Sequence, residues 1–118
     1  MHIDKNDYFA EGLIGDDYKY GKTKEGKEFV TFSLCVNTYS KDRADDTERT
    51  HSQTYVRIFV YDKRQIEYLR KVNAHRGQRA FIFGRLSSCK NEYRGITFMS
   101  LSVVCRDVSI IQTKEQPK

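Results

Sequence analysis

The sequence predicts an all-β fold, a small closed barrel of five strands with one short helix between the third and fourth strands. Three observations lead to this prediction. Apolar residues alternate with polar residues in several short segments, which is the signature of strands with one buried face. A single segment in the middle of the chain repeats its apolar residues at helical spacing. The length of 118 residues suits one compact domain.

Two strands are expected in the first third of the chain. Residues 7–14 include four large apolar or aromatic side chains and run into a Gly-Asp-Asp turn at 15–17, so they form the first strand. A hairpin turn at 24–27 precedes residues 29–39, which alternate strictly and form the second strand. Residues 40–52 are polar, mixed in charge and without an apolar period, and predict an exposed loop.

The third strand, residues 54–61, also alternates strictly. One of its faces carries only aliphatic side chains, which are Val56, Ile58 and Val60. Because successive side chains of a strand point to opposite faces, the other face carries Tyr55, Arg57, Phe59 and Tyr61.

The second half of the chain adds the helix and two more strands. Asp62 is a good N-cap for a short helix over 63–72, where apolar residues recur every three residues. Strands follow over 78–86 and 96–111, joined by a second polar loop, and the last strand is expected to bend or bulge near Arg106.

This order of elements is that of an OB-type barrel, in which the helix closes one end. We therefore expect residues 1–112 to form a single OB-fold domain. Residues 113–118 are expected to form a short disordered tail.

The composition limits the classes of partner and site. Lysine and arginine number 21 against 16 acidic residues, which gives a net charge of +5, a pI near 9.1 and a preference for anionic partners. No stretch approaches the roughly 18 apolar residues of a transmembrane helix, and the N-terminus has no apolar signal core. The three cysteines, Cys35, Cys89 and Cys105, lack the spacing of zinc ligands. We expect a reduced cytoplasmic protein without metal or cofactor.

The outward face of the third strand is the candidate binding site. Flat aromatic rings stack on unpaired bases, at roughly 1–3 kcal/mol per base, while a neighbouring cation holds phosphate. We assign Tyr55 and Tyr61 to stacking and Arg57 to phosphate. Phe59 has no polar end and is assigned to packing. The alternative is that these aromatic side chains cover a subunit interface or lie under the long loop.

Further candidate contacts come from the fourth strand and from the connections between strands. On the fourth strand, Arg79 and Arg85 flank two phenylalanines, for which interface or core packing is at least as good an explanation. Basic and aromatic residues also cluster at three strand connections, where the loops of such a barrel flank the binding face. The candidates from these clusters are Lys19, Lys22, Tyr39, Lys41, Arg43, Lys90, Tyr93 and Arg94.

The chain resembles the bacterial single-stranded DNA-binding proteins over nearly its whole length. The matching stretches are EGLIGD at 11–16, FSL at 32–34, YVRIFVYDK at 55–63, EYLRK at 67–71 and RAFIFGRL at 79–86. The resemblance implies an OB fold that binds and protects single-stranded DNA (ssDNA) without sequence specificity, in replication, recombination or repair. It also implies a bacterial, cytoplasmic and nucleoid-associated protein that assembles as a homotetramer or, less often, as a dimer.

The resemblance also suggests roles for single residues. Tyr55 stands where the family usually has a stacking tryptophan, and Tyr61 stands at a second aromatic position. Tyr39 lies within one residue of another stacking position. Asn91 falls where tryptophan is common, and Tyr93 follows two residues later.

Two departures from the family pattern narrow the expected role. The chain has no tryptophan, which suggests weaker stacking per base. Family members usually carry a long flexible tail with an acidic tip that recruits partner proteins, whereas this chain stops at Lys118. Either the tail has been removed from this sequence or the protein is a tail-less variant, which would hold ssDNA without recruiting partners or act as an accessory protein of replication restart.

Three other functions compete with this one. A nuclease needs carboxylates that converge on a metal, but the acidic residues cluster in turns and loops, at 16–17 and 45–46, so we expect no enzyme. An RNA-binding OB domain would use the same stacking and differ by recognising the 2′-OH. An assembly barrel, whose outward aromatic side chains are all interface, would not bind oligonucleotides.

Overall fold

The computed structural model describes residues 4–41 and 49–111 of the chain. The elements, in chain order, are β1 (Tyr8–Ile14), β2 (Lys19–Lys22), β3 (Glu28–Lys41), β4 (Arg49–Val60), α1 (Lys63–Lys71), β5 (Arg79–Tyr93) and β6 (Ile96–Ile111). The helix lies between β4 and β5 as expected. The short strand β2 was not predicted as a strand, and it pairs with β3 across the expected turn.

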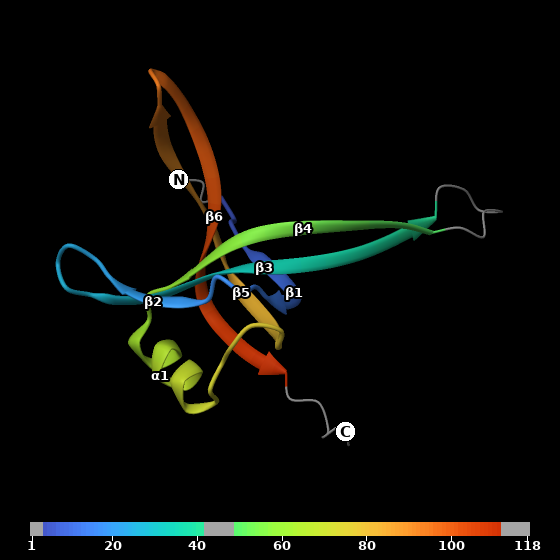
Figure 1. Cartoon of the computed structure of the whole chain (residues 1–118), viewed down its shortest axis with the longest axis horizontal. Helices are drawn as coiled ribbons and strands as arrows, with labels where there is room; N and C mark the ends of the chain where they lie inside the picture. Colours follow the sequence, from blue (N-terminus) through green and yellow to red (C-terminus); the bar gives the residue numbers. More distant parts are fainter. Residues whose placement is uncertain (1–3, 42–48, 112–118) are drawn as a thin grey trace.

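Five strands close into a barrel, in the order β1, β5, β6, β4 and β3 (Figure 1). The ring closes where β1 returns to β3, with Leu13 opposite Cys35 and Ile14 opposite Leu34. All neighbours in the ring are antiparallel except β4 and β6, which are parallel. Gly12 permits the closure, because a Cβ at this position would collide with the carbonyl oxygen of Cys35. The predicted five-stranded OB barrel is confirmed.

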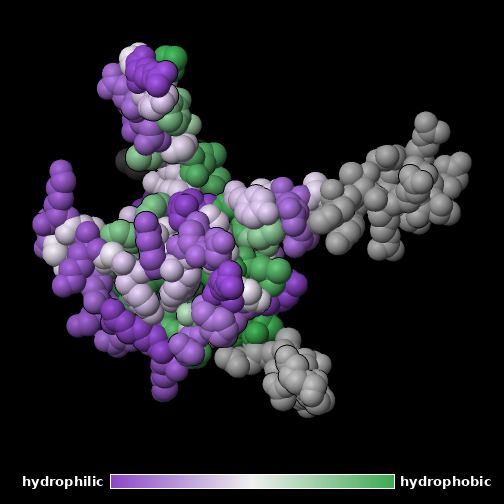
Figure 2. Space-filling model, in the orientation of Figure 1, coloured by the Kyte–Doolittle hydropathy of each residue, from purple (hydrophilic) through white to green (hydrophobic). Residues whose placement is uncertain are grey.

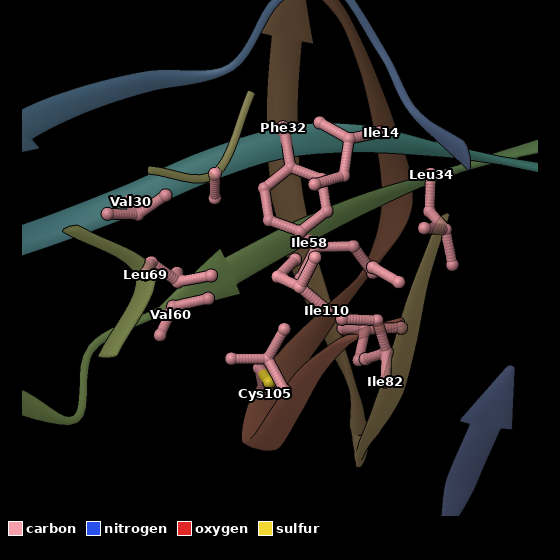
Figure 3. Close-up of a cluster of buried hydrophobic side chains, with 14 of the residues drawn as sticks. Ile14, Val30, Phe32, Leu34, Ile58, Val60, Leu69, Ile82, Cys105 and Ile110 are labelled. Atoms are coloured by element: carbon pink, nitrogen blue, oxygen red, sulfur yellow. The ribbon is translucent and has the colours of Figure 1, made fainter. Parts of the chain in front are cut away.

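The hydrophobic core fills the barrel and continues beneath α1 (Figure 3). The helix contributes Ile66 and Leu69 to the core. It is also tied to β6, because the backbone N–H of Ile110 donates a hydrogen bond to the hydroxyl of Tyr68 at 2.9 Å. The strand residues of the core are Ile14, Val30, Phe32, Leu34, Ile58, Val60, Ala80, Ile82, Val103, Cys105, Val108 and Ile110.

The prediction of a polar loop between the last two strands is wrong, and both ends of the loop predicted at 40–52 are strand, while its middle, residues 42–48, lies outside the described residues. β3 reaches Lys41 and β4 begins at Arg49, while β5 reaches Tyr93. The two hairpins project from the barrel as arms (Figure 1). Backbone pairing maintains a strand whatever its side chains, and the outer part of the β5–β6 arm is largely exposed on both faces, so it needs no apolar alternation. Its turn is formed by Arg94 and Gly95, with φ of 52° and 79°, as in a type I′ turn.

β6 contains the irregularity that the sequence predicted. The pairing of β5 with β6 shifts between Phe83 and Gly84, which makes Arg106 the extra residue of a β-bulge. Arg106 and the residue after it are both exposed, whereas Cys105 and Val108 on either side are buried. The bulge therefore allows both halves of β6 to direct apolar side chains into the core.

Some predictions lie outside the described residues. These are the disordered tail at 113–118, Arg43, and the side chains of Tyr39 and Lys41 at the far end of β3. No helix in the described part of the chain has the length and apolar character needed to span a membrane.

Candidate nucleic-acid interface

The outward side of β4 carries the aromatic and basic side chains that the alternation predicts. We call Tyr55, Arg57, Phe59 and Tyr61 the β4 face. Tyr55 is 65% exposed, and Tyr61, which follows the last residue of β4, is 47% exposed. The two tyrosines are about 20 Å apart along the extended chain, at about 3.3 Å per residue. Two accessible rings therefore lie at the two ends of one strand face.

Tyr61 belongs to a cluster of three rings. Its ring lies nearly parallel to that of Phe59, with the ring centroids 6.0 Å apart and an interplanar angle of 8°. Phe29, on the neighbouring strand β3, lies 6.1 Å from Phe59 and 6.0 Å from Tyr61, measured between ring centroids. Phe29 and Phe59 are half-buried. The cluster thus orients the Tyr61 ring while leaving much of its surface open to solvent.

Tyr55 is held by different neighbours. Its hydroxyl donates a hydrogen bond to the side-chain oxygen of Gln53 at 3.1 Å. Cys35 lies directly opposite on β3, and its thiol raises the pKa of Tyr55 above the ordinary value of a phenol. The phenol therefore stays protonated and neutral at physiological pH, and the ring does not repel a polyanion.

Arg57, which the sequence assigned to phosphate, forms an ion pair within the chain. Its guanidinium lies 3.1 Å from the carboxylate of Asp17. The same carboxylate accepts hydrogen bonds from the backbone N–H of Ser33 at 2.8 Å and from its hydroxyl at 2.7 Å. Partial burial acts to raise the pKa of Asp17, but the Ser33 hydrogen bonds and the Arg57 charge outweigh it and lower the pKa. Arg57 thus offers its remaining N–H donors with part of its charge already compensated.

The strand register places two of the predicted basic side chains beside the β4 face. Lys19 of β2 lies opposite Thr31 of β3, which lies opposite Phe59. On the other side, Val104 of β6 lies opposite both Phe59 and Arg85 of β5. Both basic residues are exposed and lie two strands from Phe59, at about 4.8 Å per strand. A cation therefore flanks the face on each side.

The tip of the β5–β6 arm carries three more of the predicted contacts. Tyr93 is 62% exposed, and the guanidinium carbon of Arg94 lies 5.2 Å from its ring centroid. Lys90 is exposed nearby, while Asn91 donates a hydrogen bond to the hydroxyl of Ser100 at 2.8 Å. Because the arm projects from the barrel (Figure 1), these residues lie apart from the β4 face.

A second aromatic surface lies across the barrel, on β1 and β5. We call Phe9, Phe81 and Phe83 the phenylalanine face. The Phe9 ring centroid lies 4.5 Å from that of Phe81 and 6.3 Å from that of Phe83, and both pairs meet edge to face. The three rings line a cavity of about 590 Å³, and Phe9 is 63% exposed. Arg79, another predicted contact, lies on β5 beside this face and pairs with Glu11 at 3.2 Å.

Sequence reasoning missed three residues around Tyr61, namely Phe29, Lys27 and Lys63. Lys27 and Lys63 line a cavity next to the Tyr61 ring. No signal in the sequence pointed to Phe29, because only the register between β3 and β4 brings the start of β3 beside the end of β4. In the described part of the chain, no group of three or more His, Cys, Asp or Glu side chains could hold a metal ion.

Comparison with known proteins gives a family and a fold. The chain matches the model of the single-strand binding protein family over residues 5–111. A Plasmodium falciparum SSB in complex with ssDNA superposes with a TM-score of 0.82 and 21% identity, covering 95% of this chain and 99% of that chain. No curated protein matched the sequence.

Two bacterial structures show the same fold. A deletion mutant of the single-stranded DNA-binding protein from Thermus aquaticus gives a TM-score of 0.75 and 18% identity, over 92% of this chain and 51% of that chain. A small single-stranded DNA-binding protein from Streptomyces coelicolor gives 0.69 and 14%, over 92% and 96%. At these identities the structures establish the fold, and the family match extends from before β1 to the end of β6. The chain belongs to the single-strand binding protein family.

Proposed function

We propose that this protein binds ssDNA without sequence specificity and protects it during replication, recombination or repair. The observation that carries the proposal is the pair of exposed rings, Tyr55 and Tyr61, on one strand face with Lys19 and Arg85 on either side. Every base has a flat π-face, so stacking on these rings accepts any sequence, and the cations contact the uniform backbone. Family membership and the ssDNA present in the Plasmodium structure support the same conclusion.

Tyr55 and Tyr61 lie in different surroundings, but both rings would stack on bases. Tyr61 is oriented by its packing against Phe59 and Phe29, and Tyr55 by its hydrogen bond to Gln53. An unpaired base can reach either ring, whereas a base within a duplex is already stacked on its neighbours. The protein should therefore prefer single strands to duplex DNA.

The second part of the proposal is that the chain forms homo-oligomers through the phenylalanine face. Phe9 is exposed although it has no polar atom, and it lies with Phe81 and Phe83 on an outer surface of the barrel. Aromatic side chains are enriched at the centres of protein interfaces, where burial removes their apolar surface from water. A tetramer is the favoured state and a dimer is the alternative.

Titration with three nucleic acids at two salt concentrations tests the binding function. We expect poly-dT to bind tightly at low salt and to quench tyrosine fluorescence, and we expect the affinity to fall steeply as salt rises. Poly-U that binds more tightly than poly-dT would indicate an RNA-binding protein instead. Equal affinity for duplex and poly-dT, or no binding even at low salt, would refute the proposal.

The same samples test whether the protein acts on the bound strand. We expect a labelled oligonucleotide to remain intact during incubation with Mg²⁺ or Ca²⁺. Accumulation of shorter fragments that increases with protein concentration would contradict the assignment as a binding protein without catalytic activity.

A further inference from the structure

A cavity of about 510 Å³ lies beside Tyr61, between the turn that joins β2 to β3 and the start of α1. We call it the hairpin–helix cavity. Its volume is within the range of about 300–1,000 Å³ that is typical of small-molecule sites. Figure 2 shows that the side of the molecule carrying β2 and α1 is covered largely by hydrophilic side chains. The lining residues are Lys22, Gly26, Lys27, Glu28, Tyr61, Lys63 and Ile66.

The cavity carries an excess of positive charge. Three of its lining residues are lysines and one, Glu28, is acidic. Glu28 is bound by Arg70 from outside the lining, with a distance of 2.9 Å between guanidinium nitrogen and carboxylate oxygen. Among the described residues, Lys22, Lys27 and Lys63 form no ion pair as close as this one. The three ammonium groups therefore remain available to an anion.

Lys22 and Lys63 both lie near the carboxylate of Glu28. The hydrogen bond and the charge of Arg70 lower the pKa of Glu28, and Lys22 and Lys63 add to this effect from nearby. One of these lysines comes from the end of β2 and the other from the first residue of α1. Two lysines about 40 positions apart in the sequence thus supply positive charge to the side of the cavity that Glu28 lines.

The turn leaves room for a ligand. The turn is closed by hydrogen bonds between backbone groups, from the N–H of Thr23 to the oxygen of Lys27 at 2.8 Å and from the N–H of Gly26 to the oxygen of Thr23 at 2.9 Å. Gly26 has a φ of 87°, and a Cβ added there would meet no atom within 4 Å. The backbone at this edge of the cavity is therefore fixed in shape and open to solvent.

We propose that the hairpin–helix cavity is a nucleotide site at which the bound strand continues beyond Tyr61. A base stacks near Tyr61 while its flanking phosphates contact Lys22, Lys27 and Lys63. An aromatic ring beside several ammonium groups suits a ligand that joins a flat base to a negative phosphate. The strand then leaves the β4 face across the β2–β3 turn toward α1. The inference rests on the proposed ssDNA binding.

The test compares two double variants of equal net charge. Lys22→Gln with Lys63→Gln removes two lysines of the cavity, and Lys5→Gln with Arg76→Gln removes two exposed cations that neither line it nor lie on the β2–β3 turn or α1. Binding of fluorescent oligo-dT is measured by anisotropy over a range of salt concentrations. Each phosphate contact to a single strand contributes about 0.7 to the slope of log K against log salt. The slope should therefore fall by about 1.4 in the cavity variant and by much less in the control.

The possible outcomes separate the two proposals. If both double variants lose the same slope, the effect is one of net charge and the cavity site is refuted, while ssDNA binding stands. If the parent protein does not bind oligo-dT at low salt, ssDNA binding itself is refuted. Thermal melting checks that the variants fold. Should the cavity variant not fold, Lys27→Gln replaces it, with an expected loss of about 0.7 in slope and an unchanged slope as the contrary result.

Discussion

The β4 face and the phenylalanine face are built alike but differ in one chemical respect. Each gathers aromatic rings on the outside of the barrel, and each includes a ring that is about two-thirds exposed, Tyr55 on one and Phe9 on the other. The exposed rings of the β4 face carry hydroxyl groups, and those of the phenylalanine face do not. A tyrosine can remain at a wet surface because its polar end stays hydrated, whereas an exposed phenylalanine gains from being covered.

Arginine does not distinguish the two faces. Arg57 is paired with Asp17 at 3.1 Å, and Arg79 is paired with Glu11 at 3.2 Å. Both faces therefore combine rings with an arginine whose charge is partly compensated. Under the proposed function, the type of aromatic residue, rather than the presence of a cation, distinguishes the face that would bind nucleic acid from the face that would contact another chain.

The largest effect should follow from removing the rings of the β4 face. Tyr55→Ala with Tyr61→Ala removes stacking on two bases, and at about 1–3 kcal/mol per base the affinity for oligo-dT should fall by about 30-fold or more. Fluorescence anisotropy measures the change. The control is Tyr55→Phe with Tyr61→Phe, which keeps both rings and should bind nearly as the parent does. Parent-like affinity of the alanine variant would show that the bases stack elsewhere.

A second substitution should act on assembly. Phe9→Glu places a charge among the rings of the phenylalanine face, so burial of this surface against a second chain becomes unfavourable. Light scattering after size-exclusion chromatography should show a particle of half the parent mass or less. The control, Tyr55→Glu, places the same charge on the β4 face and should leave the mass unchanged. A monomeric parent, or equal masses for parent and Phe9→Glu, would contradict the assembly proposal.

A smaller effect is expected from the carboxylate that holds Arg57. Asp17→Asn weakens one ion pair and the hydrogen bonds from Ser33, so the free energy of unfolding should fall by about 1 kcal/mol at pH 7. Because folding lowers the pKa of Asp17, its stabilisation is complete above the ordinary value near 3.9 and is lost as pH falls through the lowered value. Urea denaturation at pH 7 and pH 3 should show less acid sensitivity in the variant.

The matched control for this substitution lies beside the phenylalanine face. Glu11→Gln breaks an ion pair with Arg79 between two side chains that are each more than two-fifths exposed, so its effect on the free energy of unfolding should be at most about 1 kcal/mol. We expect Glu11→Gln to lose less stability than Asp17→Asn, because Asp17 also accepts two hydrogen bonds from Ser33. A larger loss for Glu11→Gln would contradict this order.

The smallest effect concerns the two paired arginines and DNA. Arg57→Gln should reduce the slope of log K against log salt by at most about 0.7, because one phosphate contact is lost. Arg79→Gln should leave this slope unchanged, because Arg79 lies beside the phenylalanine face and away from the proposed path of the strand. Equal reductions in the two variants would mean that the strand passes over both faces.

The sequence predicted the barrel because its strands must place apolar residues inward at every second position. Phe32, Ile58 and Ile82 are each fully buried, as the alternation required. The arms could not be found in this way. Residues such as Lys90 and Glu92 belong to a strand whose outer part is exposed on both faces, so their polarity contains no sign of the pairing.

The candidate site was predictable only as far as one strand determines it. The positions of Tyr55 and Tyr61 followed from alternation within β4. Their neighbours Phe29, Asp17 and Lys63 come from other elements, and the register between elements brings them to the site. A single sequence does not reveal that register, because many pairings satisfy the same alternation.

The bulge at Arg106 determines which changes in length the barrel tolerates. Because Arg106 is the extra residue of the bulge, its deletion would leave Val108 and Ile110 facing the core and remove only the irregularity, whereas deletion of Ser109 would rotate Ile110 out of the core. Removing two residues from each strand at the tip of the β5–β6 arm would leave every inward side chain where it is. The loss of Ser109 alone should therefore damage the protein more than the loss of four residues at the tip, and length variation should concentrate in the arms.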